Sequence, residues 1–218
     1  MRFHLVLFAL LLAAACGHAT PAEKTPEGIE QVLRGARLGT AFGDFVDAHP
    51  EAVYSDAELR ATPVSKEAPG ALLIVHAQDP FLDLYNFSNF GFKEGNLYEL
   101  VAVWSGEPDT VRAQGPQFIK AVMKRHSRDY TRKSIRVFPK SKEERPVAVF
   151  YWEDKDAATL AFYTPPYAYD PHAKATLTYA QFSKGDPFLN DIFTNIATTP
   201  EQHDQVWRDI DDIVKALK

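Results

Sequence analysis

Residues 87–104, FSNFGFKEGNLYELVAVW, predict a β-hairpin, and this hairpin decides the fold class. Residues 87–92 alternate phenylalanine with polar residues, and residues 97–104 form the clearest strand pattern of the chain. The triplet Glu94-Gly95-Asn96 between them has the composition of a tight turn. A turn this short joins strands that run antiparallel.

Further strands are predicted on both sides of this hairpin. Residues 71–77 (ALLIVHA) form a short continuous apolar run that is typical of a buried strand. Four more strands are predicted at residues 134–138, 147–152, 159–163 and 175–182. The connections between strands are short, which favours antiparallel pairing and argues against a Rossmann-like fold.

Two short helices are predicted before the first strand. Ile29 and Leu33 have helical spacing, and Gly35 can end that helix. Thr40 is a good N-cap for a second helix, which would end before Pro50.

Longer helices are predicted in the middle and at the end of the chain. Residues 109–125 have a helical pattern, with an interruption at Gly115-Pro116. Pro187 can open a helix, and residues 205–217 carry one apolar stripe. The sequence therefore predicts an α+β fold, with antiparallel β-sheet packed against N-terminal, central and C-terminal helices.

The N-terminus carries an export signal. Arg2 is followed by an apolar run at residues 3–12, which is too short to span a bilayer. Ala13, Ala14 and Ala15 supply the small residues of a cleavage site, and Cys16 follows at once.

This arrangement resembles the lipobox of bacterial lipoproteins. The resemblance implies that Cys16 receives a diacylglycerol, that residues 1–15 are removed as a signal peptide, and that the new N-terminus is acylated. Gly17 follows the cysteine where an Asp would favour the inner membrane, so the resemblance also implies an outer-membrane location. The alternative is an ordinary secretory signal cut at the same bond. It leaves an unpaired cysteine in an exported protein.

The composition of the chain limits its structural class. Hydrophobic residues make up 45% of the sequence and charged residues 24%, which are ordinary globular values.

Residues 16–27 are polar and proline-bearing and predict a flexible tether. Residues 28–218 predict one globular domain, or two sub-halves that meet near residue 108. Cys16 is the only cysteine, so the sequence offers no disulfide and no thiolate metal cluster.

The mature domain has two weaker similarities. Its Leu38-Gly39-Thr40 turn and its element order resemble small outer-membrane assembly lipoproteins of the SmpA type and β-lactamase-inhibitor-like domains. The tetrapeptide DPFL occurs at residues 79–82 and 186–189, and residues 101–104 resemble residues 147–150. The two pairs do not share one period, as a duplication would require.

No standard catalytic or nucleotide-binding motif is present, and no two histidines of the mature chain lie three or four residues apart. The first candidate site is the loop at residues 163–172 (YTPPYAYDPH), which joins two predicted strands. Long loops are often functional, and tyrosines on a proline-stiffened loop suit recognition. Its candidate binding residues are Tyr163, Tyr167, Tyr169 and His172. The alternative is that the loop covers a sheet edge.

The second candidate is a basic patch. Residues 120–145 hold ten basic and three acidic residues in a chain whose net charge is −5. Such a patch could contact anionic headgroups, cell-wall polymer or an acidic partner, or it could be a solvated surface. Its candidate residues are Lys124, Arg125, Arg128, Arg132, Lys133 and Arg136.

Together these features predict an exported, lipid-anchored envelope protein that acts as a non-catalytic binding or assembly module. Alternatives are a cell-envelope hydrolase with a non-standard site and a small-ligand-binding lipoprotein. Apart from the lipid on Cys16, no cofactor and no metal is expected. The expected partners are the membrane and an envelope protein or anionic surface, and export excludes nucleic acid.

Overall fold

The computed structural model describes residues 27–66, 71–79, 81–137, 146–166, 173–184 and 186, with four further positions, Arg208, Asp211, Asp212 and Lys215. Two short helices open the described chain, α1 (Glu30–Leu33) and α2 (Phe42–Ala48). The first four strands follow: β1 (Val53–Tyr54), β2 (Leu72–Asp79), β3 (Leu84–Lys93) and β4 (Asn96–Gly106). The long helix α3 (Pro108–His126) precedes the last four: β5 (Arg132–Val137), β6 (Pro146–Glu153), β7 (Ala157–Thr164) and β8 (Ala175–Ser183).

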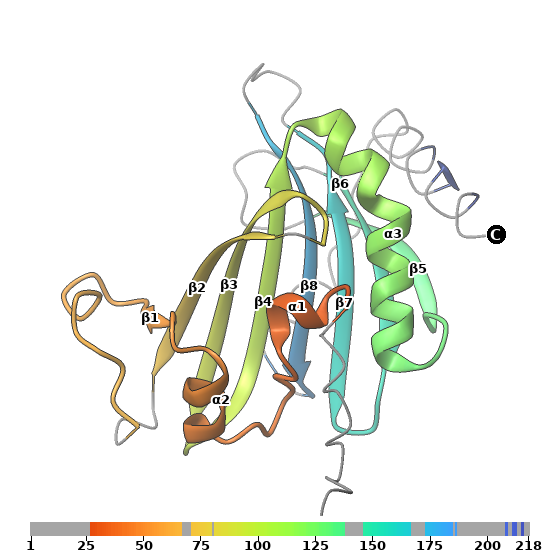
Figure 1. The fold of residues 1–218 in the computed structure, drawn as a ribbon. Helices are drawn as coiled ribbons and strands as arrows, with labels where there is room; N and C mark the ends of the chain where they lie inside the picture. Colours follow the sequence, from red (N-terminus) through yellow and green to blue (C-terminus); the bar gives the residue numbers. More distant parts are fainter. Residues whose placement is uncertain are drawn as a thin grey trace, which may run out of the picture.

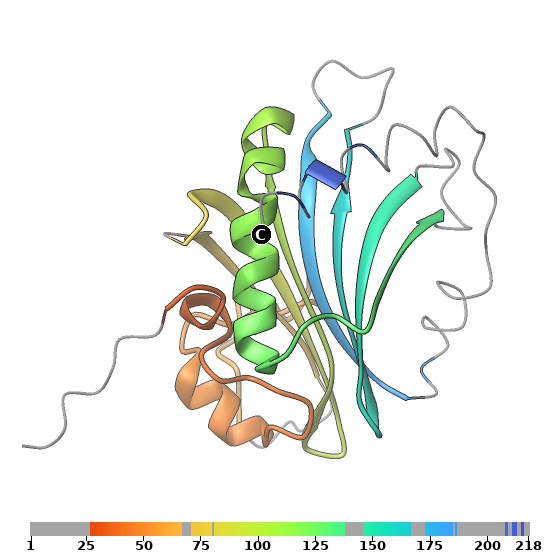
Figure 2. The same cartoon turned by 90° about the vertical axis from the view of Figure 1, so that its right-hand side faces the viewer.

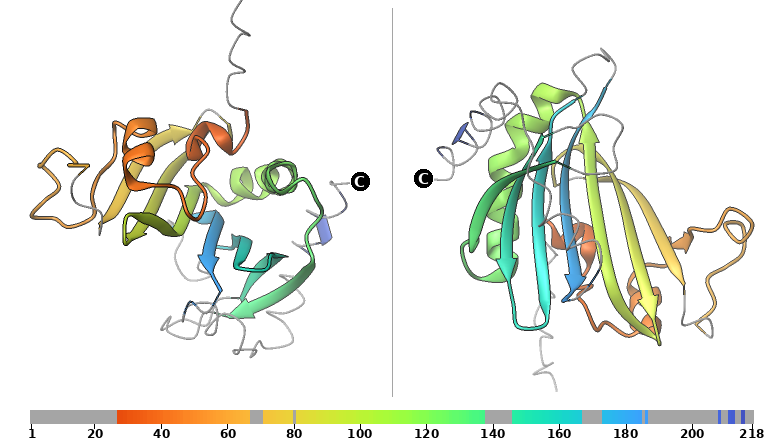
Figure 3. Two further views of the ribbon diagram at one scale, coloured as in Figure 1. Left: turned by 90° about the horizontal axis from the view of Figure 1, so that it is seen from below. Right: turned by 180° about the vertical axis from the view of Figure 1, so that it is seen from behind.

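All eight strands belong to one antiparallel sheet (Figure 1). The strand order is β1-β2-β3-β4-β8-β7-β6-β5, so two consecutive four-stranded meanders are joined by the pairing of β4 with β8. The helices lie on one face, which we call the inner face, and the opposite outer face is seen from behind (Figures 2 and 3). The α+β class and the antiparallel sheet are therefore confirmed.

The predicted hairpin is present as β3 and β4. Glu94 and Gly95 have φ values of 52° and 79°, and two successive positive values are what a type I′ hairpin turn requires. A β-bulge interrupts the pairing at Gly91 and Phe92. The other predicted strands correspond to β2 and to β5–β8, although Phe138 lies outside the described residues.

In β3, two polar residues of the strand lie on its buried side. Asn86 and Ser88 face the inner side and are fully buried, whereas Tyr85 and Phe87 face outward. The buried pair is satisfied because Ser88 donates to the Asn86 amide oxygen at 2.9 Å. The Asn86 amide in turn donates to the Val103 carbonyl at 3.2 Å.

Two details of the helix prediction were wrong. Thr40 is not the N-cap of α2, which begins after Ala41 without a side-chain cap. Instead its hydroxyl accepts from the Arg37 amide at 2.9 Å, and its carbonyl accepts from the Leu97 amide at 2.9 Å. Helix α3 also runs through Pro116 without interruption. The burial of its apolar face outweighs the single backbone hydrogen bond that proline removes.

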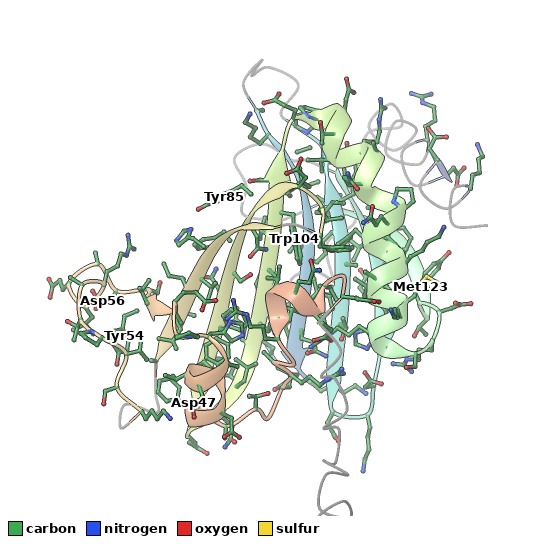
Figure 4. The ribbon with its side chains drawn as sticks, viewed as in Figure 1. Asp47, Tyr54, Asp56, Tyr85, Trp104 and Met123 are labelled. Carbon is green, nitrogen blue, oxygen red and sulfur yellow. The ribbon has the colours of Figure 1, made fainter. Side chains whose placement is uncertain are left out.

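The main core lies between the inner face and the helices. Trp104 of β4 is fully buried there, and its ring centroid lies 5.4 Å from that of Phe118 in α3 (Figure 4). A second buried cluster lies on the outer face of the β5–β8 meander. It consists of Val147, Val149, Tyr151, Ala158, Leu160, Phe162, Ala180 and Phe182. Strands β6, β7 and β8 therefore bury side chains on both faces.

The boundary expected near residue 108 falls between β4 and α3. One of the two short internal similarities does not occupy equivalent places, because residues 101–104 lie in the last strand of the first meander and residues 147–150 in the second strand of the other. The other includes positions outside the described residues. They give no support to a duplication. Of the predicted helix at 205–217, the four described positions are helical, and its placement stays a prediction. Among the described residues, no helix has the length and apolarity needed to cross a membrane.

Candidate functional site

The structure separates the residues of the predicted recognition loop. Tyr163 lies within β7, on the inner face, with 4% of its surface exposed. It is a core residue and cannot contact a partner. Tyr167, Tyr169 and His172 lie outside the described residues, so their role stays a prediction.

The predicted basic patch is also divided. Arg132, Lys133 and Arg136 belong to β5, which is an edge strand of the sheet. The Lys124 ammonium pairs with Glu27 at 3.0 Å, and the Arg128 guanidinium pairs with Asp154 at 2.6 Å. The described cations at the end of α3 are thus matched by acids. They do not form one surface of unbalanced positive charge.

Arg125 points into the protein, and its side chain is fully buried. Its Nε donates to the Tyr179 hydroxyl at 3.0 Å. Its two terminal nitrogens donate to the Glu30 carboxylate and to the Ala36 carbonyl. One guanidinium on α3 therefore holds α1, the chain after α1 and strand β8 together.

His126 continues this buried network. Its ring stacks on Trp152 with centroids 5.7 Å apart, and its Nε2 lies 3.3 Å from the Tyr179 hydroxyl. Burial and then the neighbouring Arg125 cation lower the pKa of His126 to about 4. The ring is therefore neutral near pH 7. Tyr179 accepts from Arg125 and donates to His126 Nε2.

A second buried histidine supports α1 from the other side. His49 stacks on Phe45 with centroids 4.4 Å apart, and its Nε2 donates to the Leu33 carbonyl at 3.2 Å. Burial lowers its pKa, so this ring is neutral too. Both histidines pack against aromatic rings between the helices and the sheet, His49 fully buried and His126 half-buried.

A cleft of about 490 Å³ opens beside the Arg125 network. It is lined by Glu27, Glu30, Arg37, Phe81, Lys120 and Lys124, among others. The acids of this cleft pair with its bases, as in Lys124 with Glu27 and Arg125 with Glu30. Within the part of the chain that the structure describes, no three metal-ligating side chains come together.

The outer face of the β1–β4 meander differs from the rest of the molecule. Leu72 is 45% exposed, Tyr85 48% and Tyr98 37%, although all three are large apolar side chains. His76 and Phe87 lie opposite each other in β2 and β3, with ring centroids 4.8 Å apart. The Tyr85 hydroxyl is hydrogen-bonded to His76 Nδ1. We call Leu72, His76, Tyr85, Phe87 and Tyr98 the open face.

Two features shape the open face. Tyr85 projects away from the sheet (Figure 4). A Cβ atom added at Gly91 would lie 3.1 Å from the Tyr98 ring, so the ring rests directly on the glycine. Burial, followed by the charges of Glu99 and Asp186, raises the pKa of Tyr98. The sequence analysis did not identify this face, because the exposure of its side chains depends on what packs against the sheet, which local periodicity does not record.

Comparisons with known proteins give no relative. No family model matches the chain, and neither the curated proteins nor the solved structures contain a significant match.

We predict that Arg125→Leu lowers the free energy of unfolding by about 2–4 kcal/mol, because it leaves the buried Tyr179 hydroxyl and Ala36 carbonyl without their donor. Arg112→Leu is the matched control, since Arg112 pairs with Asp109 on the exposed side of α3 and such pairs contribute about 0–1 kcal/mol. Urea denaturation at pH 7 measures both. Equal effects would contradict a central role for Arg125.

We also predict acid destabilisation through His126. The native pKa lies below the ordinary 6.5, so the unfolded chain takes up the proton first as the pH falls. The stability gained from keeping His126 neutral in the folded protein is fully present above pH 6.5. It is lost progressively as the pH falls to about 4. Its size is of the order of 3 kcal/mol. The measurement is the difference in unfolding free energy between wild type and His126→Gln from pH 7 to pH 4. A difference that does not change with pH would contradict it.

Proposed function

We propose that the protein is an exported, lipid-anchored envelope protein, and that it is a non-catalytic binding or assembly module whose recognition surface is the open face. One observation carries the proposal. The outer face of β6, β7 and β8 carries a buried cluster, whereas the same face of the β1–β4 meander leaves Leu72, Tyr85 and Tyr98 exposed.

Exposed aromatic residues on a rigid sheet suit protein recognition. Tyrosine offers a large contact area with few rotatable bonds, and clusters of such residues mark interaction sites. The Tyr85 and His76 side chains are already held by their hydrogen bond, and Tyr98 rests on Gly91. A partner would therefore meet a surface that is largely ordered before binding.

The lipid on Cys16 and the tether at residues 16–27 complete the proposal. They would hold the domain within reach of a membrane surface. The proposal includes an outer-membrane location and a C-terminal helix at residues 205–217 packed on the same domain.

A small-ligand function has one observation in its favour. A cleft of about 580 Å³ lies between the loop after β1 and the start of β2. Its walls include Tyr54, Leu59, Pro63 and Leu72. This size and apolar character are ordinary for small-molecule sites. A ligand bound there would raise the melting temperature with its concentration.

We predict that a photoreactive amino acid at Tyr85 crosslinks a discrete envelope protein in the cells that produce this chain. The same amino acid at Arg112, which is exposed on α3 across the sheet, is the control and should give no such product. The product should also be lost when Tyr98 is changed to Ser. A partner crosslinked from Arg112 and not from Tyr85 would remove the open face from the proposal.

We further predict that the detergent-extracted mature protein begins at Cys16 and carries a covalent lipid. Intact-mass measurement identifies this lipid, and Cys16→Ser should abolish it and leave the signal peptide uncut. An ordinary secretory signal predicts a different result. In that case the wild type lacks the lipid, and the variant is cut normally.

A further inference from the structure

The two edges of the sheet differ in the number of charged residues they carry. Strand β5 forms one edge and carries Arg132, Lys133 and Arg136 among its six residues. At the other edge, β1 pairs only with Leu73 and Ile74 of β2. Strand β2 carries one formal charge, at its last residue Asp79, and none in residues 72–78. Charges on an edge strand oppose the addition of a further strand, so β5 is more strongly protected than residues 72–78 of β2.

The backbone of β2 presents free hydrogen-bonding groups beyond β1. The Leu72 carbonyl accepts from Ser55 on the β1 side at 2.8 Å, whereas the Ala71 carbonyl accepts from Phe92 on the β3 side at 2.9 Å. Alternation along an antiparallel strand then directs the N–H and C=O of His76 and Gln78 to the β1 side. No strand among the described residues pairs with that part of the edge.

Among the described residues, the backbone before β1 turns away from this edge. Before β1, the Ala52 amide bonds to the His49 carbonyl at 3.0 Å, so the backbone turns toward α2 and does not continue along β2. Beside the free edge stand His76 and, one strand further in, Phe87 and Tyr85 of the open face. A strand placed alongside β2 would therefore set its outward side chains against the His76 ring.

We propose that the edge of β2 at His76 and Gln78 binds an extended, uncharged segment of a partner protein by strand addition, with apolar or aromatic side chains lying toward the open face. This rests on the proposed binding function and names its partner class. The extended form follows from the two pairs of free backbone groups, which only an extended backbone matches. The absence of charge in the bound segment follows from residues 72–78 of β2, which carry no formal charge, and from the rings beside them.

A second copy of the chain fits this edge less well. Two copies related by a two-fold axis could pair only through residues 76–79, because β1 blocks the edge at Ile74. A stable dimer buries about 1,200–2,000 Å² in total, far more than four residues of a strand pair supply. The joined sheets would also leave the open faces of both copies uncovered.

The test uses random dodecapeptides displayed on phage and selected on the immobilised mature protein. The selected sequences are then synthesised and their dissociation constants are measured against three proteins. We expect Gln78→Pro to weaken binding about ten-fold or more, which corresponds to about 1.4 kcal/mol. Gln78→Val is the matched control and should bind as wild type does, since valine keeps the backbone N–H. Proline is tolerated on an edge strand whose N–H faces outward, so the fold should persist.

Hydrogen exchange provides a second measurement that does not depend on that variant. Exchange of the His76 and Gln78 amides should be fast in the free protein and slow in the peptide complex. If Gln78→Pro does not fold, Gln78→Lys replaces it, because a lysine protects the edge as the cations of β5 do.

Several results would overturn the inference. One is that the selection yields no binding peptide. Another is that Gln78→Pro and Gln78→Lys both bind the peptides as wild type does. A third is that the peptide protects only amides of other strands from exchange. A concentration-dependent dimer that Gln78→Pro dissolves would show that a second copy occupies the edge. The peptide assay does not use the envelope partner. If Tyr85 gives a crosslink and the peptide assay fails, the open face is still supported as a binding surface, and strand addition at β2 is rejected.

Discussion

A buried positive charge constrains the whole inner layer of this protein. The Arg125 guanidinium lies in the core, and such a charge is tolerated only when it is paired and fully hydrogen-bonded. Its acceptors come from α1, from the chain after α1 and from β8. Because α3 supplies the charge, the position of each of these elements depends on the others.

The pairing of β4 with β8 is the second constraint, because it joins two meanders into one sheet whose halves have different surroundings. Helix α3 contacts β4, β7 and β8 and so covers this junction on the inner face. On the outer face, β6, β7 and β8 carry a buried cluster, whereas Leu72, Tyr85 and Tyr98 of the β1–β4 half are exposed. The asymmetry separates a part of the sheet that stabilises the fold from a part that is available to a partner.

The basic residues of the predicted patch have two different roles. Arg125 and Arg128 hold elements together through Glu30 and Asp154. Arg132, Lys133 and Arg136 lie on an edge strand, where positive charge discourages the addition of another strand. The edge of β2 at residues 72–78, which carry no formal charge, is the contrasting case, and it stands next to the exposed rings of the open face.

The sequence by itself determined the strands and the antiparallel hairpin, because these depend on local periodicity and turn chemistry. The export signal stays a prediction. Asn86 and Ser88 show where that reasoning stops, since their burial depends on the helices across the sheet. The same is true of Arg125, whose partners lie 95 and 54 residues away. Exposure of Tyr85, burial of Tyr163 and the free edge of β2 were decided only by tertiary structure. A side chain's environment is set by the strand order, and no local pattern records which strands become neighbours.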